Sequence, residues 1–171
     1  MKLKDARMMQ RWLRLLALSG ILTAVAACAA PESEKQPDAV LAQQALTTFF
    51  ADLHAGRYDQ AAEAYAGPYE TMIDHNPSLD PADHVALLRN ACTINGAQCL
   101  EIRTAELLPT EAAGEFRFAV QFQLDDGSVF VQGPCCGGSV EDFPPFSTFT
   151  YVVIKGEGGR FRVMDMPVYK P

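Results

Sequence analysis

The chain has 171 residues, of which 49% are hydrophobic and 20% are charged. This length fits one ordinary domain with additional segments, and the hydrophobic fraction excludes a wholly disordered chain. Residues 28–171 carry 20 acidic and 9 basic residues. Because so acidic a surface repels phosphate backbones, nucleic-acid binding is excluded as a function.

The first 27 residues have the pattern of a secretory signal peptide. Residues 1–14 hold five basic residues, and residues 15–27 (LLALSGILTAVAA) carry no charge. An apolar run of 13 residues is shorter than the roughly 20 residues that a transmembrane helix needs. It does match the apolar region of a signal peptide.

The end of this segment resembles the lipobox of bacterial lipoproteins. Cys28 follows Val25, Ala26 and Ala27, a branched apolar residue and two small ones. The resemblance implies that residues 1–27 are removed and that Cys28 receives a lipid anchor, with acyl chains such as palmitate. We therefore expect an extracytoplasmic protein held to the bacterial cell membrane, with the inner and outer membranes both left open.

Residues 28–38 are predicted to connect this anchor to the folded domain. The segment AAPESEKQPD after Cys28 has two prolines, several charges and no large apolar residue. Such a composition is typical of a flexible tether, and ten residues of it span roughly 17 Å.

Three helices are predicted before any strand. The first begins at Asp38 and ends near Gly56, and its apolar residues recur every three or four positions: Ala42, Ala45, Leu46, Phe49, Phe50 and Leu53. A shorter helix covers about 58–65. The third begins with Asp80 as its cap and Pro81 in its first turn, and it runs to about Cys92.

The apolar period changes to two after Asn95-Gly96. Residues 115–124 (EFRFAVQFQL) place alternate apolar side chains on one face, which we expect to pack against the first helix. Further strands are expected near 99–108, 129–133, 148–155 and 160–168, with hairpin turns at Asp126-Gly127 and Gly158-Gly159. Helices that precede an antiparallel sheet predict an α+β fold.

Two segments resemble NTF2-like domains. FFADLHAGRYDQAAEAY is similar to the opening helix, Gly-x-Tyr corner and second helix of that superfamily, and GRFRVMDMPV is similar to its final strand. The resemblance implies that residues 39–171 form an NTF2-like domain, in which three N-terminal helices pack on a curved antiparallel sheet in a cystatin-like cone. Such cones often enclose a pocket for a small apolar ligand. The resemblance assigns no catalytic residue to this chain.

Asp165 is the candidate catalytic carboxylate. It lies in phase with Phe161 and Val163 on the last expected strand, so it is expected to point inward. A buried carboxylate has a raised pKa and can serve as a base. The alternative is a structural aspartate at the end of a strand.

His75 and His84 are candidate metal ligands. They lie in sequence among Asp74, Asp80 and Asp83, whose carboxylates could complete a metal site. The alternative is that the aspartates only cap turns and helices, and no metal or other cofactor is expected.

Export to an oxidising compartment predicts that the other four cysteines form disulfides. Cys92 ends the third helix and Cys99 begins the next strand, which favours a bridge between them across the Asn95-Gly96 turn. Cys135 and Cys136 then pair with each other, where flanking glycines permit a strained ring, or stay free.

These features together predict a lipid-anchored module that binds a small ligand or acts as a scaffold, and that is not an enzyme. The first alternative is a small pocket enzyme, an isomerase or a dehydratase, which needs a convergent acid–base pair. The second is a structural protein of the cell envelope.

Overall fold

The structure, a computed structural model, describes residues 38–134 and 137–170. By its internal contacts the chain divides into Met1–Lys35 and Gln36–Pro171, and every described residue belongs to the second unit. The expected signal peptide, the lipid site at Cys28, the tether up to residue 37 and the Cys135–Cys136 pair lie outside the described residues. Within the described part, no helix is long and apolar enough to cross a membrane.

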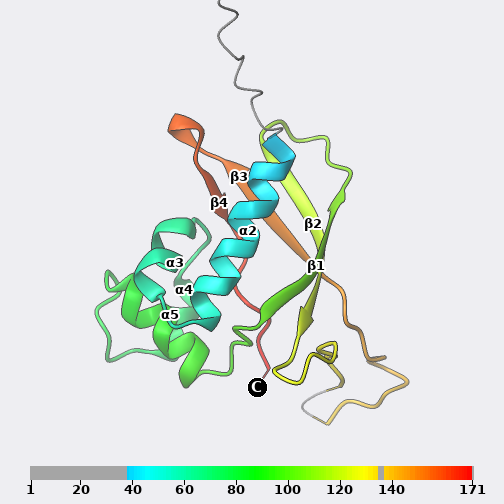
Figure 1. Ribbon diagram of the computed structural model, residues 1–171. Helices are drawn as coiled ribbons and strands as arrows, with labels where there is room; N and C mark the ends of the chain where they lie inside the picture. Colours follow the sequence, from blue (N-terminus) through cyan, green and yellow to red (C-terminus); the bar gives the residue numbers. More distant parts are fainter. Residues whose placement is uncertain (1–37, 135–136, 171) are drawn as a thin grey trace, which may run out of the picture. The chain divides into compact units, whose positions relative to one another are not determined.

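Among the described residues, four α-helices precede the first strand (Figure 1): α2 (Asp38–His54), α3 (Tyr58–Ala64), α4 (Glu70–His75) and α5 (His84–Thr93). The predicted apolar stripe of the first helix is confirmed, because Leu46, Phe49 and Phe50 have no exposed surface. Gly56 adopts a φ of 73° after the helix, in the left-handed region that glycine occupies without strain.

The prediction of three helices, all of them N-terminal, is wrong in two respects. Helix α4 was not predicted, since its six residues bury a single side chain, that of Met72, and so show no apolar period. A short 3-10 helix, η1 (Glu157–Gly159), also lies between the last two strands.

The helix predicted from Asp80 begins later, at His84. The Asp83 carboxylate accepts the amide hydrogen of Ala86 and so caps α5. The Asp80 carboxylate instead accepts the amide hydrogen of Ala82, 2.9 Å away, within the preceding turn. The expectation that Asp80 caps this helix is therefore wrong, because Asp83, three residues later, is the residue that binds the first turn.

The sheet has four antiparallel strands in the order β1-β2-β3-β4. They are β1 (Glu101–Leu108), β2 (Glu115–Gln123), β3 (Phe149–Lys155) and β4 (Phe161–Val163). The predicted alternation in β2 is confirmed, because Phe118, Val120 and Phe122 are buried between exposed or half-buried neighbours. The α+β class is therefore correct.

The strand expected at 129–133 does not form. The chain turns at Asp126-Gly127 as predicted, with Gly127 at a φ of 78°. After the turn only single bridges join Gln123 to Val129 and Gln132 to Phe146. Gly133 and Pro134 follow at once, and neither residue favours the continuation of a ladder. The described residues between β2 and β3, 124–134 and 137–148, therefore form a long loop, here called the β2–β3 loop.

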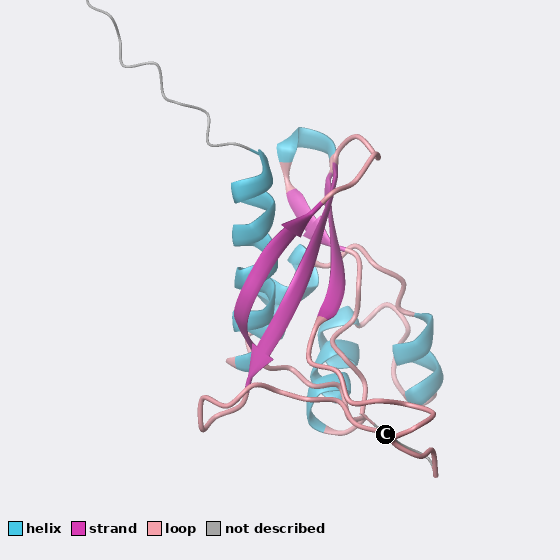
Figure 2. Ribbon diagram, turned by 90° about the vertical axis from the view of Figure 1, so that its right-hand side faces the viewer, coloured by secondary structure: helices cyan, strands magenta, loops and turns pink. Residues whose placement is uncertain are grey.

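Helix α2 crosses one face of the sheet, and α3–α5 gather beside one end of it (Figures 1 and 2). The contact between helix and sheet is aromatic. The Phe50 ring centroid lies 4.8 Å from that of Phe122 on β2 and 4.9 Å from that of Tyr151 on β3. This confirms that the apolar face of β2 packs against the first helix.

Candidate functional site

Asp165 lies beyond the last strand instead of within it. Strand β4 ends at Val163, so the expected continuation of the strand to 168 is wrong. The Val152 amide on β3 donates to Asp165 Oδ2 at 2.6 Å. The carboxylate thus takes the place of a strand partner where the β3–β4 ladder ends.

Burial raises the pKa of the Asp165 carboxyl above its usual value. The hydrogen bond from Val152 and the positive charge of Arg117 lower this pKa and oppose the effect. Its other charged or titratable neighbours include Tyr65 and Tyr151, whose own pKa values burial raises above the usual range. These tyrosines stay protonated at neutral pH, so they supply no second base beside Asp165.

His75 and His84 make contacts with different aromatic rings. The His75 ring lies 5.5 Å from the Tyr169 ring, at the C-terminal end of the domain. The His84 ring stacks on Tyr69 with centroids 3.8 Å apart and planes within 8°. Across the described residues, no group of three or more His, Cys, Asp or Glu side chains is arranged to hold a metal ion.

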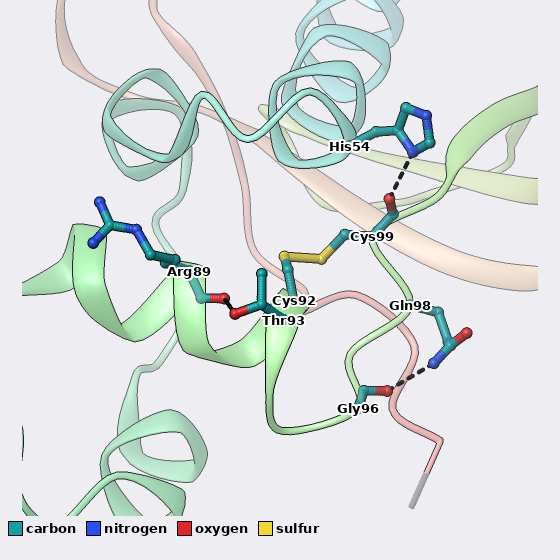
Figure 3. The surroundings of a disulfide bond; sticks show 7 residues. All are labelled: His54, Arg89, Cys92, Thr93, Gly96, Gln98 and Cys99. Atoms are coloured by element: carbon teal, nitrogen blue, oxygen red, sulfur yellow. Dashed lines mark hydrogen bonds between the residues drawn. A yellow bond between two sulfur atoms is a disulfide. The ribbon is translucent and has the colours of Figure 1, made fainter.

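Cys92 and Cys99 form a disulfide with Cα atoms 5.5 Å apart, as the sequence predicted. The bridge joins the last turn of α5 to the residues just before β1 (Figure 3). His54, at the end of α2, donates its Nδ1 hydrogen to the Cys99 carbonyl at 3.1 Å. One short region therefore connects α2, α5 and the start of the sheet.

Replacing both Cys92 and Cys99 by alanine is expected to lower the free energy of unfolding by about 2–3 kcal/mol. The bridge closes a loop with a sequence separation of seven residues, and the loss reflects the added freedom of the unfolded chain. Urea unfolding of the purified chain measures it. A reductant should destabilise the wild type by a similar amount and leave the double variant much less affected. Equal effects of the reductant on both proteins would contradict the claim.

The β2–β3 loop encloses a cavity of about 480 Å³, which the sequence did not predict. Its aromatic lining residues, Phe143 and Phe146, are 63% and 49% exposed. Backbone hydrogen bonds in both directions between Phe146 and Gln132 hold the two sides of the loop together. The described lining residues are Gln132, Gly133, Pro134, Gly137, Gly138, Phe143, Pro144 and Phe146. We call this feature the loop cavity.

The loop cavity is connected to the hydrophobic core through aromatic contacts. The Phe146 ring lies 5.1 Å from Phe149 at the start of β3, and Phe149 lies 5.8 Å from the buried Phe122. The exposed Phe146 is therefore connected through Phe149 to the packed hydrophobic core. A clue in the sequence was the run FPPF, in which prolines hold two phenylalanines in a segment without strand or helix periodicity.

The loop cavity lies at the end of the sheet remote from the start of α2. Lys155, the last residue of β3, donates to Asp38 Oδ2 at 2.6 Å. Phe149, the first residue of β3, is six residues away, or about 20 Å along the strand. Figure 1 shows the same arrangement, with the start of α2 at one end of the sheet and the β2–β3 loop at the other.

The loop cavity has the size of a small-molecule site. Its volume falls within the roughly 300–1,000 Å³ typical of small-molecule sites. None of the described residues that line it has an ionisable side chain. No protein-family model, curated protein or solved structure matches this chain.

Proposed function

We propose that this protein is a lipid-anchored extracytoplasmic module that binds an apolar group in the loop cavity. The observation that carries the proposal is a cavity rimmed by two aromatic rings, Phe143 and Phe146, that are about half exposed or more. Such surface is unfavourable in water and is typical of a binding site.

Two independent features support export and anchoring. The basic head, the short apolar run and Val25-Ala26-Ala27-Cys28 have the order found in bacterial lipoproteins. The Cys92–Cys99 disulfide lies in the folded domain and suits an oxidising compartment outside the cytoplasm. Both point to the extracytoplasmic side of the cell membrane.

The proposal includes an NTF2-like domain over residues 39–171. Its support is the order of elements: a long first helix, a corner at Gly56 and Tyr58, a second helix, and an antiparallel sheet against which the first helix packs. In this domain the loop cavity lies outside the interface between α2 and the sheet, which aromatic side chains fill.

Binding is favoured over the two alternatives. An isomerase or dehydratase needs an acid–base pair that converges on a cavity. The carboxylate of Asp165 is held by the Val152 amide and does not line the loop cavity. A purely structural envelope protein would not need an apolar cavity on its surface.

The anchor is tested by mass spectrometry of the protein purified from the membrane of an expressing bacterium. We expect the mature chain to begin at Cys28 and to carry a diacylglyceryl group, because one acyl chain gives only marginal membrane binding and two hold stably. Cys28→Ser should prevent the modification and release the protein from the membrane fraction. An intact Met1, or an unmodified Cys28 in the mature chain, would contradict the proposal.

The binding site is tested with a neutral apolar fluorophore such as Nile red. Phe143→Ser should weaken the binding of the probe about tenfold, since loss of an aromatic contact costs about 1.4 kcal/mol or more. Leu107→Ser is the matched control, because Leu107 on β1 is also an exposed apolar residue, at 53%. Equal probe binding by wild type and Phe143→Ser would exclude the loop cavity as the site.

A further inference from the structure

The β2–β3 loop that forms the loop cavity carries acidic residues and no basic ones. Between Arg117 and Lys155 the chain carries four acidic residues and no Lys or Arg. Two of the four, Glu141 and Asp142, are exposed and directly precede Phe143. Two exposed carboxylates therefore lie next to the rim residue Phe143 in the chain.

The Asp142 carboxylate is held in place. The Ser139 hydroxyl donates to Asp142 Oδ2 at 2.8 Å and accepts the Asp142 amide hydrogen at 3.2 Å. The Phe143 amide in turn donates to the Ser139 carbonyl at 3.0 Å. The acidic and aromatic side chains thus project from one ordered turn, and their relative positions are set before anything binds.

The β2–β3 loop exposes apolar side chains in addition to those that line the loop cavity. Val131 and Val140, in the same loop, are 51% and 55% exposed, in addition to the two phenylalanines of the rim. A molecule contained within about 480 Å³ would leave much of this surface in water. A segment of protein, with several apolar side chains in a row, covers more of it.

Charge and position argue against two other occupants of the loop cavity, a second copy of this chain and a lipid surface. Residues 38–171 carry 18 acidic and 8 basic residues, so a second copy of this chain would be repelled. Anionic lipids repel the same surface. In addition, the loop cavity lies at the end of the sheet away from the residue that the tether enters, Asp38.

We propose that the β2–β3 loop docks a basic amphipathic segment of a partner protein. An apolar side chain of the segment enters the loop cavity and packs on Phe143 and Phe146. Its Lys or Arg side chains lie against Glu141 and Asp142, where opposite charges steer the encounter and set the orientation. This inference rests on the proposed function, since it identifies the apolar group that the cavity holds.

The experiment compares three labelled synthetic peptides by fluorescence anisotropy with the full mature protein. The first combines leucines and lysines at helical spacing, the second replaces its lysines by glutamates, and the third replaces its leucines by serines. We expect binding of the first peptide only. Its affinity should fall with added salt, because exposed charge pairs are screened.

Two double variants test whether the carboxylates of Glu141 and Asp142 contribute to the affinity for the peptide. Glu141→Gln/Asp142→Asn should weaken the binding of the first peptide about three- to tenfold and reduce its salt dependence. The matched control is Asp59→Asn/Glu63→Gln, which removes two exposed carboxylates from α3 and should leave the affinity unchanged. Phe143→Ser should weaken the peptide and Nile red alike, whereas Glu141→Gln/Asp142→Asn should weaken only the peptide.

Several outcomes would overturn this inference. The first is that the glutamate peptide binds as tightly as the lysine peptide, and the second is that Asp59→Asn/Glu63→Gln lowers the affinity as much as Glu141→Gln/Asp142→Asn does. A third is self-association of the protein that Phe143→Ser abolishes. A fourth is Phe143-dependent binding of the lipid-free Cys28→Ser protein to vesicles of phosphatidylethanolamine and phosphatidylglycerol. If Nile red binds and the first peptide does not, this inference fails and the proposed function stands. If neither binds, both fail.

Discussion

Truncation of Phe50 to alanine is expected to lower the free energy of unfolding by about 3–5 kcal/mol. Phe50 has no exposed surface and contacts aromatic rings of α2, β2 and β3. Its loss leaves a cavity between the first helix and the sheet, and the surrounding rings can only partly collapse into it.

Chemical denaturation followed by far-UV circular dichroism measures this change. Phe143→Ala is the matched control, because it removes the same side chain from a position that is 63% exposed. We expect the control to change the free energy of unfolding by less than about 1 kcal/mol. A loss for Phe50→Ala as small as that of the control would show that α2 does not pack on the sheet.

Gly67→Ala is expected to destabilise the domain by about 3 kcal/mol or more. A Cβ atom at residue 67 would overlap the carbonyl oxygen of Met164 and the hydroxyl of Tyr65. The neighbouring Ala66 amide donates to the Val163 carbonyl at 2.8 Å, so this segment lies directly against the end of β4. Backbone atoms cannot move aside as a flexible side chain can, and the two segments must separate.

The matched control for this prediction is Gly133→Ala. A Cβ there meets nothing within 4 Å, and the residue does not have a positive φ. Urea unfolding should therefore show almost no change for Gly133→Ala beside the large loss for Gly67→Ala. If both variants unfold at the wild-type urea concentration, the close approach of residue 67 to Met164 is not present in solution.

The features that the sequence predicted correctly depend on local periods or short spacings. The stripe of α2 repeats from Ala42 to Leu53, about three turns of helix, and the alternation of β2 runs without interruption from Phe116 to Phe122. The Cys92–Cys99 bridge closes across a short turn. In each case residues close in sequence carry the whole signal, because helix and strand geometry places them on one face or at one turn.

The features that only the tertiary structure decided depend on contacts between residues far apart in the chain. Helix α4 buries one residue, and Asn76 at its end donates to the Asn95 side chain, 19 residues away. Just beyond the end of β4, the Asp165 carboxylate accepts the amide hydrogen of Val152, 13 residues away, a contact that alternation in the sequence could not predict.

The loop cavity is the clearest case of this difference. Its two sides meet through hydrogen bonds between Gln132 and Phe146, in a segment whose glycines and prolines give no period. The exposure of Phe143 depends on the path of the backbone around it, and the amino-acid pattern does not predict that path. The amino acids alone determined where the apolar groups and charges lie along the chain. Packing determined which of them remain in water, and therefore which can bind.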